Sequence, residues 1–348
     1  MKTLWLFRTD IKKLEYYHEF KDLETFKLKC HDFYLLQGIW FLENDVFDEV
    51  IIWRLSDKQI SDITFNINGK KFIQRWIKNS NEVFKYTPPT ISFFRGGFSF
   101  YCYLTKRKPK FFGLKLYLAA GRRLLPQYGG IYDKILIEDE IDTINNSMAF
   151  YKTTNPNIFK PLDLKKKFDI CIISNFSQLK YKGTDFIINQ ISKDKTGFLK
   201  SLKICHVGNN NKVGIKLCRN LNINNIEFIG ELKRSKINKV LNKSKFGIVA
   251  SNRQDGCPRV ITEILTSGTP LFIKSETRLL DYYKNHGVIK FDNNFVDKIK
   301  KGFQDYKELK KDLQKNLFKF EVSQICKLNI NMWLHIKNNS WRVIFVIV

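Results

Sequence analysis

Short apolar runs alternate along this chain with longer stretches in which apolar and polar residues mix at helical spacing. Such runs are typical of buried strands, and the longer mixed stretches are typical of helices. Their alternation predicts an α/β protein whose parallel sheets carry helices on both faces. In the first half we predict strands at 2–7, 48–55, 90–97, 114–120 and 132–138, with helices at 23–42 and 69–79.

A second series of strands and helices follows residues 150–167. That segment, "FYKTTNPNIFKPLDLKKK", contains Pro156 and Pro161 and has little periodicity, so it predicts a linker. Strands that alternate with short helices beyond it predict a doubly wound domain. The predicted strands are 168–174, 202–208, 226–230, 245–251 and 270–274, and the predicted helices are 183–192, 211–221, 234–243, 258–267 and 277–285.

The chain of 348 residues is long for a single core, which favours two domains of roughly 150 residues each. We predict Rossmann-like domains at 1–160 and 161–302, followed by a Lys-rich helical segment at 303–348. Two such domains joined by one linker would face each other across a cleft at the carboxyl ends of their sheets, where open α/β sheets bind ligands.

The charge of the chain points to anionic partners. Sixty Lys and Arg residues against 34 Asp and Glu give a formal net charge of +26, which attracts phosphorylated substrates, anionic membranes or nucleic acid. The lysines are scattered and form no basic tail, so a nucleic-acid partner is the least favoured of these. We expect the basic surface to suit docking at an anionic membrane.

Seven cysteines are odd in number and form no CxxC pair, so neither a disulfide framework nor a zinc site is indicated. Several lie in apolar runs and are expected to be buried, which suggests a reducing, cytoplasmic location. The N-terminal "LWLF" is too short for a signal peptide. The C-terminal "WRVIFVIV" falls short of the ~20 residues that span a bilayer, so we expect a docked terminal segment.

One stretch, "QDGCPRVITEILTSGTP" at 254–270, carries two acids around a predicted helix start. Pro258 suits the first helical position, and Cys257 is a poor N-cap, so the first-turn amides are open to Asp255 or to an anion. Glu263 lies more than one turn inside the helix. On these residues alone, a capping acid and a solvated helix acid are the favoured interpretation over a ligand site.

The order of motifs in the second half resembles the retaining GT-B glycosyltransferases of the group 1, family 4 class. "QDGCPRVITEILTSGTPLF" is similar to their E-x7-E region, with Asp255 at the first acid and Glu263 at the second. "KYKGTDFIINQI", "LKICHVGNN" and "IEFIGELKRSKINKVLNKSKFGIVAS" resemble the preceding motifs in the same order. The resemblance covers about 168–290 and departs from the pattern in having Asp at position 255.

The resemblance implies a role for each matching residue. Lys182 would contact the donor diphosphate, Glu263 the ribose hydroxyls, and Asp255 the hydroxyls of the donor sugar near the reacting carbon. Catalytic roles fall to Asp255 and Lys182. The remaining donor contacts would come from Gly183, Gly208, Arg253, Gly256, Cys257 and Pro258. Arg253 is included because the arginine that usually precedes the lysine is missing from "SNFSQL"; Lys180 and Arg259 are the alternatives.

The first domain offers weaker signals. "FFRGGF" follows a predicted strand, and we expect Arg95, Gly96 and Gly97 on the acceptor side. Arg122 and Arg123 are further acceptor-side candidates. "EDEID" at 138–142 is expected to be a solvated loop end and not a metal site, and His206 a core or strand-end histidine.

The resemblance therefore implies two Rossmann-like domains in the GT-B arrangement, with the acceptor in the first, the donor in the second, and residues 303–348 returning to the first. The expected reaction is metal-independent transfer of a sugar, with retention, from a nucleotide-sugar donor to a glycan, lipid-linked or polysaccharide acceptor, without a cofactor. A peripheral membrane location is expected. The alternatives are a nucleotide-sugar epimerase of the same fold and a non-catalytic basic protein that binds nucleic acid or membrane.

Overall fold

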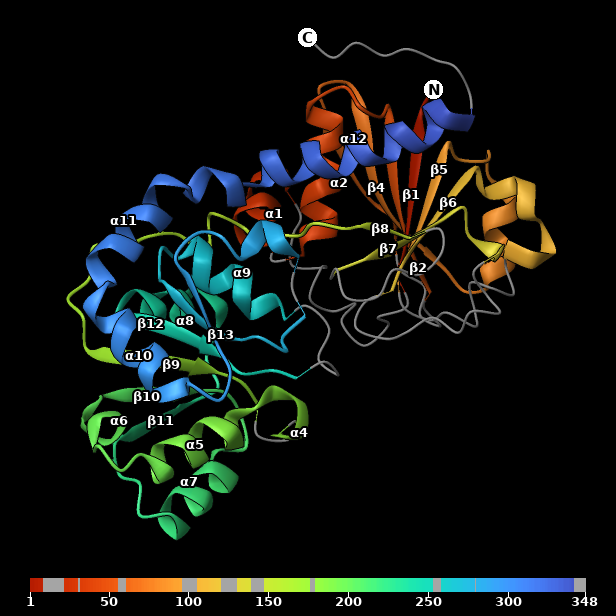
Figure 1. The fold of residues 1–348 in the computed structure, drawn as a ribbon. Helices are drawn as coiled ribbons and strands as arrows, with labels where there is room; N and C mark the ends of the chain where they lie inside the picture. The colour runs from red at the N-terminus through yellow and green to blue at the C-terminus, as the bar shows by residue number, and fades with distance from the viewer. Residues whose placement is uncertain are drawn as a thin grey trace. The chain divides into compact units, whose positions relative to one another are not determined.

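The computed structural model describes residues 1–8, 22–30, 32–55, 61–95, 105–119, 130–138, 147–175, 179–252, 258–278 and 280–340. These residues divide into two compact units (Figure 1). Unit 1 comprises the described residues of Met1–Glu138, Asp142–Asn155 and Val322–Val348, and unit 2 runs from Pro156 to Glu321. The prediction placed the boundary at 160 and began the returning segment at 303, whereas the units change at 155/156 and 321/322.

Unit 1 is built on an eight-stranded sheet with the order β3-β4-β2-β1-β5-β6-β7-β8. All neighbouring strands are parallel except β3 and β4, and the order reverses between β1 and β5, as in doubly wound folds. The strands are β1 (Thr3–Arg8), β2 (Glu49–Leu55), β3 (Ile63–Ile67), β4 (Lys70–Ile77), β5 (Ile91–Arg95), β6 (Leu114–Leu118), β7 (Lys134–Ile137) and β8 (Ser147–Ala149).

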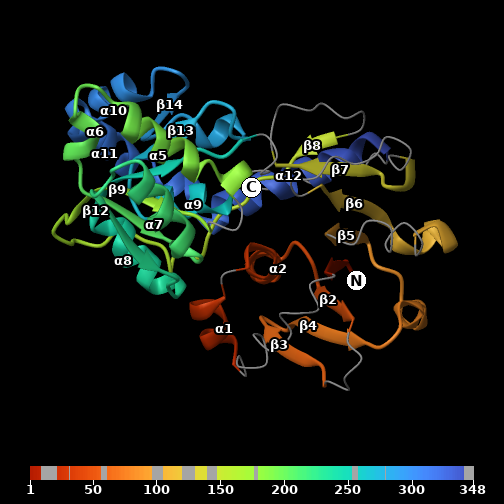
Figure 2. The same ribbon diagram turned by 90° about the horizontal axis from the view of Figure 1, so that it is seen from below.

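The predicted helix at 69–79 is wrong, because this segment forms strand β4. Asn68 and Gly69 both have positive φ, at 50° and 78°, and make the tight turn that reverses β3 into β4 (Figure 2). An Asn-Gly pair between apolar runs is a strong hairpin signal. Residues 72–74 and 76–77 of "KKFIQRWI" are buried, so both faces of the segment are covered, as fits a strand between β3 and β2.

Helix α2 (Phe33–Glu43) covers one face of this sheet, and nine of its eleven residues are buried. The predicted single helix at 23–42 is interrupted: α1 (Leu23–Lys29) ends before the N-cap residue Asp32, whose side chain accepts from the Tyr34 amide at 3.1 Å. Helix α12 (Val322–Ser340) packs on α2, where the rings of Trp333 and Phe41 lie 5.6 Å apart. The last helix therefore belongs to the core of unit 1.

The predicted linker is without helix or strand from 150 to 167 but is firmly held. Asn155 donates to the carbonyl oxygens of Lys27 and Cys30 at 2.7 and 2.6 Å, and Tyr151 exchanges two hydrogen bonds with Asn329 of α12. Past the boundary, Leu162 donates to Asn242 in unit 2 at 2.6 Å. Each part of the segment is thus fixed to its own unit.

Unit 2 is a six-stranded parallel sheet with the order β11-β10-β9-β12-β13-β14, which is the 3-2-1-4-5-6 order of a Rossmann fold. Isoleucines of α5 and phenylalanines of α10 pack on one face, and α9 packs on the other, where Ile264 lies against Gly247. The strands are β9 (Phe168–Ile173), β10 (Ile204–Val207), β11 (Ile226–Gly230), β12 (Ser244–Val249), β13 (Leu271–Lys274) and β14 (Val288–Phe291).

The helices of unit 2 agree closely with those expected from periodicity, with one exception. They are α4 (Leu179–Lys182), α5 (Thr184–Lys193), α6 (Phe198–Ser201), α7 (Asn211–Asn220), α8 (Arg234–Asn242), α9 (Arg259–Thr266), α10 (Phe295–Gln304) and α11 (Tyr306–Lys315). The predicted helix at 277–285 is instead a single 3-10 turn at Asp281–Tyr283. The buried Tyr283 anchors this segment by stacking on Phe320.

Five of the seven cysteines lie in the described residues, and all five are free and buried: Cys30, Cys171, Cys205, Cys218 and Cys326. This confirms the expected burial of Cys171 and Cys205, which lie in the apolar runs "DICIIS" and "LKICHVG". Cys102 and Cys257 lie outside the described residues, as does the C-terminal "WRVIFVIV".

Candidate functional site

The candidate site lies at the carboxyl edge of the unit 2 sheet, where the strand order reverses. Strands β9 and β12 are neighbours there although β10 and β11 separate them in sequence. Open α/β sheets bind ligands in the crevice at such a point. The segments that leave β9 and β12 are joined by a hydrogen bond from the Asn252 amide to the Tyr181 carbonyl, at 3.0 Å.

Gly208, which follows β10, is required by the close approach of two strand ends. The Ser174 amide donates to the Val207 carbonyl at 3.0 Å, so the backbone after β9 passes directly over Gly208. A Cβ at position 208 would overlap the Ser174 carbonyl oxygen. The glycine therefore lets two backbones meet at the edge where a ligand would bind, as dinucleotide-binding glycines do.

Gly183 has a similar role at the start of α5. Its φ is +67°, in the left-handed region, and a Cβ there would overlap the Ala250 carbonyl oxygen after β12. Lys182 immediately precedes it at the end of α4, with its ammonium 5.5 Å from the centre of the Tyr181 ring. The predicted lysine thus lies in the segment that crosses the point of strand reversal.

A buried polar network lies beneath these glycines. The Ser174 hydroxyl is 2.5 Å from the Thr184 hydroxyl and 3.1 Å from His206 Nε2. His206 is fully buried at the end of β10, which confirms a core, strand-end histidine. Burial lowers the pKa of His206 to about 4, so its imidazole is neutral at pH 7.

His206 should make the stability of the protein depend on pH. Its folded pKa of about 4 lies below the ordinary 6.5, so protons bind the unfolded state preferentially between these values. The free energy of unfolding should therefore fall by up to about 1.4 kcal/mol per pH unit as the pH drops from 6.5 towards 4. Urea titrations at pH 7 and pH 5 measure it. The His206→Gln variant should lose less stability between these pH values than the wild type, and an equal loss would contradict the assignment.

Glu263 is the predicted second acid, and it is buried on α9 with 3% of its surface exposed. Its Oε1 forms an ion pair with Nη1 of Arg234, the first residue of α8, and lies 4.0 Å from Nε of Arg259. A buried carboxylate needs such partners, because an isolated charge is costly to bury. Glu263 is therefore not a solvated helix acid, and the capping-and-solvation interpretation is wrong for this residue.

Arg234 was not among the residues expected from sequence. It begins a helix directly after the carboxyl end of β11, and this position in "GELKRSK" was the only available signal. Its side chain is 30% exposed, so its guanidinium can hold Glu263 and also reach the surface. The structure thus supplies a cation at this edge of the sheet.

Helix α9 begins one residue later than predicted: Pro258 is the N-cap and not the first helical residue, and no capping side chain donates or accepts a hydrogen bond there. Four predicted residues of the preceding loop, Arg253, Asp255, Gly256 and Cys257, lie outside the described residues, and their roles stay predictions.

In unit 1, Arg95 ends β5 and places its guanidinium 4.4 Å from the centre of the Tyr34 ring. Gly96, Gly97, Arg122 and Arg123 lie outside the described residues, as does most of "EDEID". The acceptor-side assignment of Arg95 therefore rests on its place at the carboxyl edge of the sheet.

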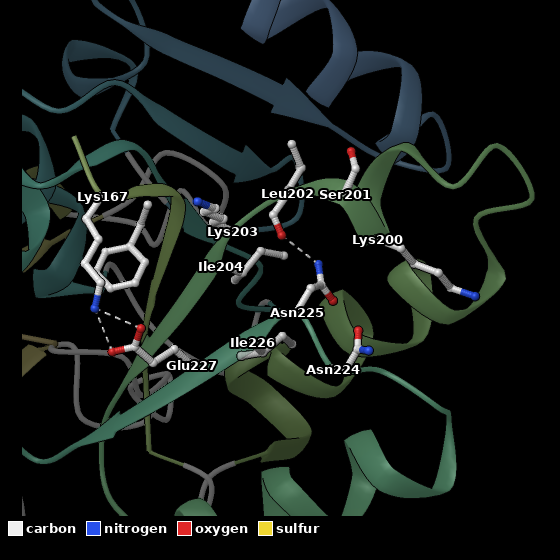
Figure 3. A pocket seen from close by; sticks show the side chains of 11 residues that line it. Lys167, Lys200, Ser201, Leu202, Lys203, Ile204, Asn224, Asn225, Ile226 and Glu227 are labelled. Atoms are coloured by element: carbon white, nitrogen blue, oxygen red, sulfur yellow. Dashed lines mark hydrogen bonds and ion pairs between the residues drawn. The ribbon is translucent and has the colours of Figure 1, made fainter.

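A separate depression of about 350 Å³ lies at the amino ends of β9, β10 and β11 (Figure 3). Lys167 pairs with Glu227 at 3.0 Å on one side of it, and Asn225 donates to the Leu202 carbonyl at 2.9 Å. Lys200 points away from that ion pair. Because open α/β sheets bind ligands at the opposite edge, we assign no substrate to this depression.

The described residues hold no cluster of metal-ligating side chains and no helix suited to span a membrane. No group of three or more His, Cys, Asp or Glu side chains in that part of the chain is arranged to hold a metal ion. Among the same residues, no helix is both long and apolar enough to cross a membrane.

A model of one known family matches the second half of the sequence. Residues 154–320 match the family described as "Glycosyl transferases group 1", and these limits nearly coincide with unit 2, Pro156–Glu321. No curated protein matches the sequence.

Several solved structures align with nearly the whole chain. HepE from Anabaena in complex with UDP aligns with a TM-score of 0.65 at 11% identity, covering 96% of this chain and 100% of its own. Sucrose-phosphate synthase from Thermosynechococcus elongatus aligns at 0.63 and 10% identity, with 97% and 100% covered. A glycosyltransferase from Rickettsia africae aligns at 0.63 and 14% identity, with 97% and 99% covered. The chain therefore has the GT-B fold of these glycosyltransferases, with two Rossmann-like parallel-sheet domains, and its residues 154–320 match group 1 of the glycosyl transferases.

Proposed function

We propose that this protein is a retaining, metal-independent glycosyltransferase that moves a sugar from a nucleotide-diphosphate donor to a hydroxyl group of an acceptor. The observation that carries the proposal is the carboxyl edge of unit 2, where Gly183 and Gly208 make close backbone approaches and Glu263 is buried on the following helix. The match of 154–320 to group 1 glycosyl transferases supports it, as does the UDP bound to HepE.

In this proposal the donor contacts come from unit 2. Lys182 stabilises the negative charge that develops on the departing nucleoside diphosphate, and the first-turn amides of α9 receive its oxygens. Glu263 accepts hydrogen bonds from the two ribose hydroxyls, for which a carboxylate provides two acceptor oxygens. Asp255 contacts the donor sugar, and the backbone of Gly256 and Cys257 lies against the sugar and phosphates.

The cation that completes the diphosphate site has four candidates: Arg253, Lys180 and Arg259 from the sequence, and Arg234. Arg253 remains the favoured candidate from the sequence. Arg234 is the candidate from the structure, because it borders Glu263 and is partly exposed at the start of α8. We propose that Arg234 orients Glu263 for the ribose and that Arg253 contacts the diphosphate.

The acceptor is assigned to unit 1, and we propose a glycan, lipid-linked or polysaccharide acceptor at the inner face of a membrane. The net charge of +26 supports attraction to anionic lipids. Binding to anionic vesicles should weaken as salt is added, since exposed charges are screened. Vesicle binding that salt does not affect would count against this location.

Nucleotide binding tests the proposal directly. UDP, GDP or ADP should raise the melting temperature, because a ligand at about 100 times its Kd stabilises the folded state by about 2.7 kcal/mol. Lys182→Ala should remove most of that shift, whereas Lys193→Ala, an exposed lysine at the end of α5, should retain it. A screen of nucleotide-sugar hydrolysis without acceptor then identifies the base and the sugar.

The alternatives predict other outcomes of the same measurements. If no nucleotide shifts the melting temperature and the protein binds DNA or RNA tightly in a salt-sensitive manner, the basic binding protein is correct and the transferase is wrong. Conversion of a nucleotide sugar to its epimer without transfer would identify the epimerase.

A further inference from the structure

A second depression of unit 2, with a volume of about 360 Å³, is lined mainly by lysines. It lies between the first residues of β14, the last strand of the sheet, and the helices α10 and α11. Figure 2 shows α10 beside this strand. Four lysines and one aspartate line the depression and give it a formal charge of +3: Lys284, Lys290, Lys298, Lys301 and Asp305. The depression is therefore at the amino end of β14, whereas the candidate donor site is at the carboxyl edge of the same sheet.

Three of these lysines have no partner within the described residues. Lys290, Lys298 and Lys301 form neither an ion pair nor a side-chain hydrogen bond there. Lys284 differs, because its ammonium pairs with Asp281 at 2.6 Å. Lys298 and Lys301 lie three positions apart on α10 and therefore share one face of the helix. The depression thus gathers an excess of positive charge, which an anion from outside the protein would neutralise.

The floor of the depression is apolar and is held in place by close packing. Three side chains form it, and the last two also pack against the core of unit 2: Val288, Ile289 and Leu309. Helix α10 lies close to the sheet because Gly302 has no side chain, and a Cβ there would come within 2.5 Å of the Phe272 ring. The Gly287 amide, just before β14, donates to Asp312 of α11 at 3.1 Å. These contacts fix β14, α10 and α11 relative to one another.

A rim of lysines over an apolar floor suits the headgroup region of an anionic lipid. A lysine carries its charge on a long apolar stem, so the stem can lie along apolar groups while the ammonium follows a mobile phosphate. Basic and apolar groups on one face also characterise protein surfaces that lie in the membrane interface. A small hydrophilic phosphate ester would gain nothing from the apolar floor.

We propose that the protein docks on an anionic membrane through this depression. Lipid phosphates lie at Lys290, Lys298 and Lys301, and the ester region of the lipid lies over the apolar floor. This inference rests on the proposed function in one respect, the membrane location, and it adds the surface that binds and the chemistry of the partner. A membrane bound there does not occupy the donor site, because the two lie at opposite ends of the strands of unit 2.

Co-sedimentation of the full chain with vesicles tests the surface. We expect the wild type to bind phosphatidylcholine vesicles only when they also contain phosphatidylglycerol, and failure to bind these anionic vesicles overturns the proposal. The depression variant carries Lys290→Gln, Lys298→Gln and Lys301→Gln. Each lysine near an anionic surface increases partitioning about fivefold, so this variant should bind the anionic vesicles about a hundredfold more weakly.

A control variant separates this surface from the overall charge of the chain. It replaces three exposed lysines of helices that do not line the depression, α5, α7 and α8: Lys193→Gln, Lys216→Gln and Lys239→Gln. Its net charge equals that of the depression variant. Salt screens exposed charges that are distant from the bilayer, so the control should bind within about twofold of the wild type. Equal losses in the two variants, or wild-type binding by the depression variant, would each overturn the proposal.

Two soluble probes decide between a membrane and other anions. We expect neither glycerol 1-phosphate nor single-stranded DNA to bind the wild type more tightly than the depression variant. If one of them does, and anionic vesicles do not bind, the occupant is a soluble phosphate ester or a nucleic acid and the membrane proposal is wrong.

The outcomes also separate this inference from the proposed function. The melting shift with nucleotide reports on the donor site and should be the same in the wild type, the depression variant and the control. If the vesicles bind in the expected pattern but no nucleotide shifts the melting temperature, the proposed transfer reaction fails and the docking surface stands. If the depression variant binds vesicles as the wild type does, the docking surface is wrong, whatever the donor site does.

Discussion

Gly208→Ala should destabilise unit 2 more than any other glycine-to-alanine substitution at the candidate site. The new Cβ would overlap the carbonyl oxygen of Ser174, a backbone atom that cannot rotate away. The Ser174 amide is itself bonded to the Val207 carbonyl at 3.0 Å, so relief requires the ends of β9 and β10 to separate. We expect a loss of at least about 3 kcal/mol in the free energy of unfolding, measured by urea titration.

Gly197→Ala is the matched control for this substitution. Gly197 also has a positive φ, +72°, but a Cβ there meets nothing within 4 Å. Its substitution should cost only the strain of a left-handed residue, about 1–2 kcal/mol. Equal losses in the two variants would mean that backbone conformation, and not the contact with Ser174, makes Gly208 necessary.

The secondary structure of unit 2 was easier to predict from the sequence than that of unit 1. Five of the six strands of unit 2 are followed by an α-helix, such as "TDFIINQISK" of α5 after β9, and only β13 is followed by a 3-10 turn instead. Local pattern and final structure agree in such a segment, so the order of elements can be derived from the sequence alone.

The prediction of a helix at 69–79 was wrong because the spacing of apolar residues in this segment is ambiguous. "KKFIQRWI" places Phe72, Gln74 and Trp76 on one face of a strand, yet its spacing of apolar residues also fits a helix. The parallel pairing with β2 fixes the segment as an inner strand of the sheet, and that pairing joins residues about twenty positions apart in the chain. Tertiary context of this kind cannot be obtained from a local window.

The candidate site could be predicted only in part, because its contacts also join residues that are distant in the sequence. Glu263 could be proposed from its place in a motif, but its ion pair joins residues 29 positions apart, so nothing local predicted Arg234. The contact between Gly208 and Ser174, and that between Gly183 and Ala250, likewise depend on strand order. A motif identifies the residues of a site, whereas the sheet topology determines which of them meet.

Glu263→Gln should reduce kcat/KM for the nucleotide-sugar donor about a hundredfold or more. The amide keeps the size of the side chain but loses the charge, and a site built to bind hydroxyls loses specificity sharply when one acceptor is replaced by a donor. Glu308→Gln, on an exposed position of α11, is the matched control and should leave kcat/KM unchanged. Steady-state kinetics with the donor identified by the hydrolysis screen measures both.

The ion pair with Arg234 makes a second measurement necessary, because loss of the pair also affects folding. Removing one partner of a buried pair costs 3–5 kcal/mol, but Arg234 is 30% exposed, so we expect a smaller loss of about 1–2 kcal/mol in unfolding free energy. Urea titration of Glu263→Gln separates this loss from the kinetic effect. If the Glu263→Gln variant is folded and binds the donor with wild-type affinity, the proposed contact between Glu263 and the ribose is wrong.

A double-mutant cycle then decides what Arg234 does. If Arg234 only orients Glu263, Arg234→Gln should weaken donor binding in the wild type and have no further effect in Glu263→Gln, because the group that it orients is already lost. If Arg234 contacts the diphosphate itself, the two effects should add, and the double variant should lose the product of the single fold-changes. Additive losses would show that Arg234 contacts the donor directly, because its effect would then not depend on Glu263. Arg234 would in that case take the place of the arginine that is missing from "SNFSQL" before Lys182.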